Sequence, residues 1–168
     1  VGMQEAQTYQ LAAQAAGVAH ARKLKGERAM NWVFMSDGEF QSGMTWETIQ
    51  ALSFHQVGAL TVVVDVNGQQ CDGCCASVMN HEPLDARIVA FGGACRVIDG
   101  HDPAALIAAA GTPHEDRPLF ILGQTDPCRG LPLLRRNAPK LHYLRFKSDA
   151  ERAEYQAILK EFQRTEGR

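Results

Sequence analysis

Two polar residues come directly after two apolar runs of the chain, and their chemistry suits a divalent cation. Asp37 follows the apolar run at 29–35, and Asn67 follows the run at 59–66. If both runs are parallel strands joined by one helix, both turns lie at the carboxyl edge of the sheet, where open α/β sheets bind ligands. A carboxylate, an amide oxygen and a nearby backbone carbonyl suit Mg²⁺, which usually completes its shell with phosphate oxygens and water.

Ordinary turn chemistry is the alternative interpretation of the same residues. Asp37-Gly38 and Asn67-Gly68 are among the commonest turn dipeptides, so each one alone more often marks only a turn. The pair is more specific, because each member follows an apolar run and one helical segment joins them. Glycine in both turns would also let the backbone approach a ligand closely.

The rest of the pattern predicts an α/β domain with a parallel sheet flanked by helices, as a single domain over residues 1–168. We expect strands at 29–35, 59–66, 94–98 and 118–122, and helices at 4–25, 45–56, 83–91, 103–110 and 148–164. We expect a loop at 128–144, with Cys128 able to be exposed. Trp32 and Phe34, two residues apart on a strand, are most simply interpreted as core.

Composition excludes several function classes. The net charge of −2 and the lack of a basic block argue against nucleic acid and anionic membranes as partners. No run approaches the roughly 18 apolar residues of a membrane helix. Five cysteines, an odd number, do not suggest a disulfide framework, so we expect a reducing cytoplasm. The Cys71-x-x-Cys74-Cys75 cluster lacks a second pair, which favours free small hydrophobic residues over a metal site.

The segment from Ser36 to Gly73 resembles the diphosphate-binding domain of thiamine-diphosphate enzymes, in the transketolase form. It carries the Asp-Gly-Glu start at 37–39, the Trp46-Glu47 pair and the strand end at 64–68. The similarity continues through Asp-Gly-His-Asp at 99–102 and a late loop histidine. It covers nearly the whole chain.

The resemblance implies roles for particular residues. In the family pattern Asp37, the Asn67 side chain and the Gln69 carbonyl would bind Mg²⁺. His142 would face the diphosphate and the substrate channel and act in catalysis. The same pattern implies thiamine-diphosphate contacts from seven residues, namely Ser36, Asp37, Gly38, Glu39, Asn67, Gln69 and His142.

The resemblance also implies an incomplete enzyme. The glutamate that contacts the aminopyrimidine ring belongs to a separate pyrimidine-binding domain, so we expect a partner subunit carrying that domain, in a heterotetrameric or self-associated assembly. The expected reaction moves a two-carbon ketol unit from a ketose to an aldehyde, with sugar-type substrates. We also expect an N-terminal portion of the domain to lie outside this sequence.

Departures from the family pattern keep two alternatives open. Ser36 stands where the motif has its first glycine, and Ser42 where it usually has a glutamate. These departures favour a non-catalytic or regulatory homologue of the fold. The first component of a 2-oxo acid dehydrogenase shares the aspartate–asparagine motif and is the other alternative.

Overall fold

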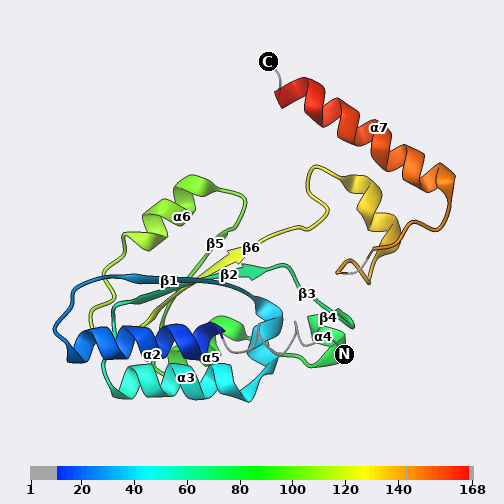
Figure 1. Ribbon diagram of the computed structural model, residues 1–168. Helices are drawn as coiled ribbons and strands as arrows, with labels where there is room; N and C mark the ends of the chain where they lie inside the picture. The colour runs from blue at the N-terminus through cyan, green and yellow to red at the C-terminus, as the bar shows by residue number, and fades with distance from the viewer. Residues whose placement is uncertain (1–10, 143, 167–168) are drawn as a thin grey trace.

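A four-stranded parallel sheet lies at the centre of the molecule (Figure 1). The computed structural model describes residues 11–142 and 144–166. The strands are β1 (Asn31–Ser36), β2 (Leu60–Val66), β5 (Ala94–Asp99) and β6 (Leu119–Gln124), in the order β1-β2-β6-β5. All three pairings are parallel, so the four carboxyl ends lie at one edge of the sheet. This confirms the predicted fold class.

Helices and short elements connect and cover these strands. The helices are α2 (Leu11–Leu24), α3 (Gly43–Phe54), α4 (Cys75–Val78), α5 (Leu84–Ala90), α6 (Pro103–Ala110) and α7 (Asp149–Glu166). Two 3-10 turns, η1 (Asp37–Gln41) and η2 (Pro132–Asn137), and a small antiparallel hairpin of β3 (Gln69–Gln70) and β4 (Gly73–Cys74) complete the described elements. The predicted helix at 4–25 is described from Leu11, and its first residues lie outside the described range. No described helix has the length and apolar character needed to cross a membrane.

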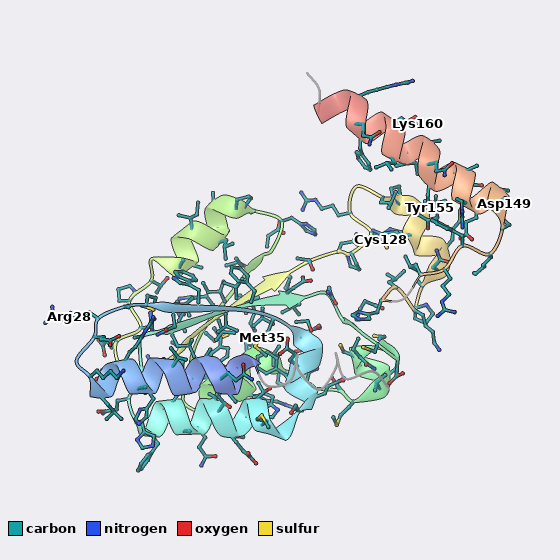
Figure 2. The ribbon with its side chains drawn as sticks, viewed as in Figure 1. Arg28, Met35, Cys128, Asp149, Tyr155 and Lys160 are labelled. Atoms are coloured by element: carbon teal, nitrogen blue, oxygen red, sulfur yellow. The ribbon has the colours of Figure 1, made fainter. Side chains whose placement is uncertain are left out.

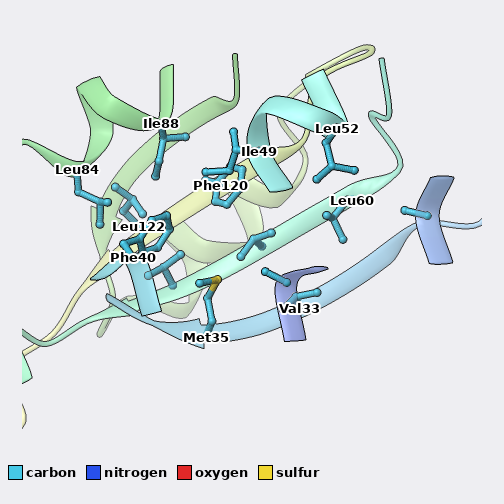
Figure 3. Packing of buried hydrophobic residues seen from close by; sticks show 14 of the residues in the cluster. Val33, Met35, Phe40, Ile49, Leu52, Leu60, Leu84, Ile88, Phe120 and Leu122 are labelled. Carbon is cyan, nitrogen blue, oxygen red and sulfur yellow. The ribbon is translucent and has the colours of Figure 1, made fainter. Parts of the chain in front are cut away.

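One face of the sheet carries the main core (Figure 3). Alternate β1 residues Val33 and Met35 point to this face and pack with Phe120 of β6 under α2, α3 and α5. Phe40 of η1 meets the Phe120 ring edge to face, with centroids 6.2 Å apart. The first turn after β1 is therefore anchored directly to the core.

The opposite face is covered only in part. Helix α6 packs on β5 and β6, where Ala109 contacts the cluster containing Leu119 and Ile121. On β1 the side chains of Trp32 and Phe34 are 51% and 70% exposed. The prediction that these two aromatics belong to the core is wrong, because α6 does not extend over β1.

The C-terminal arm, residues 125–166, is more structured than a loop prediction implies. η2 lies inside the segment predicted as a loop, and Cys128 is buried rather than exposed. Helix α7 begins after Ser148, whose hydroxyl accepts the Glu151 N–H at 3.1 Å. Tyr155 of α7 lies beside η2, where its hydroxyl accepts a 3.2 Å hydrogen bond from the Asn137 amide (Figure 2).

Candidate functional site

The turn that follows β1 buries two carboxylates at the carboxyl edge of the sheet. Asp37 and Glu39 are 1% and 3% exposed. Glu39 Oε1 accepts the backbone N–H of Ser36, the residue just before η1, at 3.2 Å. The Trp46 indole donates to the Phe40 carbonyl at 2.8 Å and holds the turn against α3. Glu47, the neighbour of Trp46 in the family-like pair, is exposed.

The turn that follows β2 contacts the Asp37 carboxylate. Gly68 N–H donates to Asp37 Oδ2 at 2.9 Å, so the two turns converge at one edge of the sheet, as their positions after neighbouring strands require. Gly68 has a φ of +68°, a conformation that favours glycine. Asn67 Oδ1 accepts the Gln69 N–H at 2.8 Å, and its amide nitrogen donates to Asp65 Oδ2 at 2.7 Å.

The β3–β4 hairpin brings a backbone carbonyl to the same place. A Cβ on Gly38 would lie 3.1 Å from the Gln70 Cβ and 3.8 Å from the Gln69 carbonyl oxygen. The hairpin therefore packs directly on η1, and a side chain at position 38 would force Gln70 to shift by a few tenths of an ångström. The resemblance assigns a ligand role to this Gln69 carbonyl, which lies close to Gly38.

Several buried polar atoms in and around η1 have no hydrogen-bond partner among the described residues. They are Asp37 Oδ1, Glu39 Oε2, Gln70 Nε2 and His81 Nδ1. Buried polar atoms in native proteins nearly always have partners, so such a cluster indicates a site that binds something else. An unpartnered carboxylate oxygen, with an amide oxygen and a backbone carbonyl on the neighbouring turn and hairpin, suits a hard cation such as Mg²⁺.

Burial also raises the pKa of the Asp37 carboxyl. The Gly68 N–H, His81 and the Gly38 N–H oppose this rise without cancelling it. Burial likewise raises the pKa of Glu39, against a smaller opposing effect from the Ser36 N–H. A bound cation would offset the cost of keeping these carboxylates ionised.

Reasoning from sequence missed three residues of this neighbourhood. His81 Nε2 lies 3.9 Å from Asp37 Oδ2, with the two side chains 5% and 1% exposed. Burial and the nearby Asp37 raise the pKa of the Cys75 thiol to about 12, so the thiol is protonated. Gln70 packs on Gly38. No local signal could have found these contacts, because they join segments more than 30 residues apart.

The segment carrying His142 reaches the hairpin from the C-terminal arm. The Leu141 N–H donates to Gln69 Oε1 at 3.3 Å, across 72 positions of the chain. His142 itself is exposed at this point. Its role in catalysis stays a prediction.

The remaining candidate motifs have local structural roles. In the Asp-Gly-His-Asp turn, Asp99 accepts the His101 N–H and Asp102 caps α6. The His101 ring accepts the Asp126 N–H at 2.8 Å, which supports the turn interpretation over a direct catalytic one. No disulfide joins the five cysteines, all of which lie within the described ranges, and no three His, Cys, Asp or Glu side chains in those ranges form a metal-binding group.

Known proteins resemble this chain in sequence and in fold. The family profile described as "Transketolase, thiamine diphosphate binding domain" matches residues 2–150. The chain belongs to the transketolase family. The family resemblance predicted from the motifs is therefore confirmed.

Individual relatives agree with this assignment. A transketolase family protein of Sinorhizobium fredii is 36% identical over 134 residues, covering 78% of this chain and 48% of the relative. One of the named subunits of the apulose-4-phosphate transketolase of Actinobacillus succinogenes is 24% identical over 136 residues, covering 80% and 49%. The chain thus spans about half the length of these two relatives.

Solved structures show the same fold. A transketolase from Pichia stipitis, solved with fructose 6-phosphate, superposes with a TM-score of 0.62 at 16% identity, over 94% of this chain and 28% of that chain. A transketolase from Campylobacter jejuni superposes with a TM-score of 0.58 at 18% identity, over 91% and 28%.

Proposed function

We propose that this chain is the diphosphate- and Mg²⁺-binding component of a two-subunit transketolase that moves a two-carbon ketol unit from a ketose to an aldehyde. The observation that carries the proposal is Asp37 Oδ1, a buried oxygen with no hydrogen-bond partner among the described residues. It lies at the edge where the β1 and β2 turns converge. Family membership gives the class of cofactor.

The residues present fit a metal-bound diphosphate. Asp37 Oδ1 and the nearby Gln69 carbonyl offer two oxygens. The Asn67 amide oxygen would supply the third, either through its second lone pair or by giving up its hydrogen bond with the Gln69 N–H. Gly38 presents a backbone with no side chain toward the hairpin. When bound, thiamine diphosphate would supply the carbon nucleophile that ketol transfer requires. The residues of this chain bind and orient its diphosphate end, and His142 would face the substrate.

A partner must supply the rest of the enzyme under this proposal. The aminopyrimidine end of the cofactor needs a pocket and a glutamate, which the family places on a pyrimidine-binding domain. A relative named as one subunit of an apulose-4-phosphate transketolase supports a divided enzyme. We propose that α2 and α3 form much of the interface. Between them lies an apolar hollow of about 300 Å³, lined by small residues such as Ala16, Gly17 and Ala51.

A non-catalytic homologue remains the second candidate, for one reason. Both ends of the Asn67 amide are already engaged by protein atoms, at 2.8 and 2.7 Å. A chain that kept the fold but lost the metal would also use this amide as an ordinary turn residue. The matched family and the relatives named above are transketolases, which argues against the dehydrogenase alternative.

Titration of thiamine diphosphate into the purified chain, with and without Mg²⁺, tests the proposal. We expect Mg²⁺-dependent binding by calorimetry, and Asp37→Ala should weaken it by about 100-fold or more. Asp116→Asn is the matched control, because Asp116 is an exposed carboxylate before β6, at the opposite edge of the sheet. Repeating the titration and a ketol-transfer assay with the pyrimidine-domain subunit separates the two candidates. Binding that ignores Mg²⁺ and Asp37 would contradict the proposed site. Loss of all Mg²⁺-dependent binding, or binding without turnover, would favour the non-catalytic homologue.

A further inference from the structure

The C-terminal arm carries a concentration of positive charge. Between Asp126 and Asp149 the sequence has six lysine and arginine residues and no aspartate or glutamate, in a chain of net charge −2. Three of these cations are already paired with carboxylates, as Arg129–Asp99, Arg135–Asp126 and Arg136–Glu154. The other three, Lys140, Arg145 and Lys147, form no ion pair within residues 11–142 and 144–166.

These three unpaired cations line one hollow of about 570 Å³. Its walls are residues 137–140 and 144–147, and none of the lining residues is acidic. Asn137 adds an amide to the lining, and the hollow has the size of an ordinary small-molecule site. A concave surface lined by charges of one sign concentrates ions of the opposite sign, so this hollow favours an anionic ligand.

Helix α7 supports both walls of the hollow. The Phe146 ring packs against the Tyr155 ring with centroids 5.5 Å apart, and the Asn137 amide donates to the Tyr155 hydroxyl at 3.2 Å. Glu151 accepts the Lys147 backbone N–H at 2.6 Å at the start of the helix. The two walls are therefore held in place by packing and hydrogen bonds.

The hollow adjoins the proposed diphosphate site. Leu141 lies between the two walls in the chain, and its N–H donates to Gln69 Oε1 at 3.3 Å. The Gln69 carbonyl in turn lies beside Gly38. His142, which would face the substrate, is the next residue after Leu141. A ligand in the hollow would thus lie next to the segment that we expect to meet the substrate.

We propose that Lys140, Arg145 and Lys147 form an anion subsite that binds the phosphate ester of a phosphorylated sugar substrate. These residues would determine specificity for phosphorylated over neutral sugars. A guanidinium donates two parallel hydrogen bonds to phosphate oxygens, and the two ammonium groups add further positive charge. The inference rests on the proposed function for the identity of the ligand as the substrate, whereas the anion site itself rests on the charges and the hollow.

Titration of the full chain with fructose 6-phosphate, fructose and inorganic phosphate, followed by NMR chemical shifts, tests the subsite. Fructose 6-phosphate should bind most tightly, and Arg145→Ala should raise its dissociation constant by about 10-fold. Arg145→Lys keeps the charge but loses the paired hydrogen bonds, so its loss should be smaller. Arg136→Ala is the matched control, because it removes a positive charge that lies outside the hollow.

A second readout uses the enzyme reconstituted with the pyrimidine-domain subunit. Arg145→Ala should raise KM for a phosphorylated ketose by about 10-fold and leave kcat within about two-fold, as expected for a group that holds the substrate away from the reacting atoms. Lys147→Ala should act in the same direction and provides an independent variant. A fall in kcat with an unchanged KM would contradict a role in substrate binding.

Three results would overturn the inference. Both variants could bind fructose 6-phosphate as tightly as the wild type. Inorganic phosphate could bind as tightly as the sugar phosphate, which would indicate a site for free phosphate. Arg145→Ala could weaken Mg²⁺-dependent binding of thiamine diphosphate, which would assign the hollow to the cofactor. A chain that binds the sugar phosphate in the hollow but no thiamine diphosphate would instead contradict the proposed function and leave the anion site in place.

Discussion

The two turns that converge at the site differ in how well their polar atoms are satisfied. The turn after β1 buries Asp37 and Glu39, and each carboxylate keeps one oxygen without a partner among the described residues. The turn after β2 is half exposed, and its Asn67 side chain is hydrogen-bonded at both ends. Burial of unpartnered carboxylate oxygens in the turn after β1 costs free energy, which a bound ligand would offset. The Asn67 side chain in the turn after β2 already has its hydrogen bonds and needs no ligand. We infer that the turn after β1 supplies the primary metal contact, and that the turn after β2 is already ordered and positions its oxygen beside that contact.

Asp37→Asn should give the largest effect and separate ligand binding from stability. Burial raises the pKa of this carboxyl in the folded chain above 3.8. Between 3.8 and the raised folded pKa the native state binds more protons than the unfolded state, so stability falls as pH rises through that window. The asparagine variant removes the buried charge. In the metal-free protein at pH 7 we expect its Tm to rise by about 2–4 °C, corresponding to ~1 kcal/mol, while Mg²⁺-dependent binding is lost.

Thermal melts from about pH 4 to 8, in the presence of a chelator, measure this effect. The wild type should lose stability with rising pH over the lower part of the range, and the variant should lose less. A variant that is less stable than the wild type at every pH would show that the Asp37 carboxylate is satisfied inside the protein. Asp116→Asn serves again as the exposed control.

Asn67→Ala should have the opposite effect on stability and a smaller effect on metal-dependent binding. The substitution removes the hydrogen bonds to the Gln69 N–H and to Asp65, each worth about 0.5 kcal/mol at this half-exposed turn, or about 1 kcal/mol together. We expect the Tm to fall by about 2–4 °C and Mg²⁺-dependent binding to weaken by about 10-fold. Asn67→Asp keeps an oxygen in the turn and should recover most of the binding. Equal binding by the alanine variant would confine Asn67 to a structural role.

The positions of the two turns could be predicted from the sequence, but the hydrogen bonding of their polar atoms could not. Each of the four sheet strands has a predicted counterpart within about two residues at each end, because apolar runs bounded by turn residues determine them locally. The convergence of the Asp37 and Asn67 turns followed from the parallel arrangement alone. Their ligand roles stay predictions, since polar satisfaction depends on contacts that periodicity does not report.

Other features depended on distant parts of the chain. Trp32 and Phe34 have the same apolar character as Val33 and Met35, but the described helices pack on only one face of β1. Nothing in the strand itself distinguishes the two faces. The β3–β4 hairpin and η1 are too short to show a period. His81 looks like an isolated polar-loop histidine until the fold brings it to Asp37.

His142→Ala should have the smallest effect on the chain itself. His142 is exposed, and its segment touches the site through the Leu141 N–H and Gln69 Oε1 at 3.3 Å, a bond that the substitution leaves in place. Because exposed substitutions usually change stability by less than about 0.5 kcal/mol, we expect an unchanged Tm and near-normal Mg²⁺-dependent binding. In an enzyme reconstituted with the pyrimidine-domain subunit, turnover should still fall by about 10-fold or more, in line with loss of a positioned acid or base. Arg136→Ala, six residues away and also exposed, is the control for general disturbance of the segment. If both variants turn over at the wild-type rate, the metal-site turns can remain correct while His142 loses its proposed role.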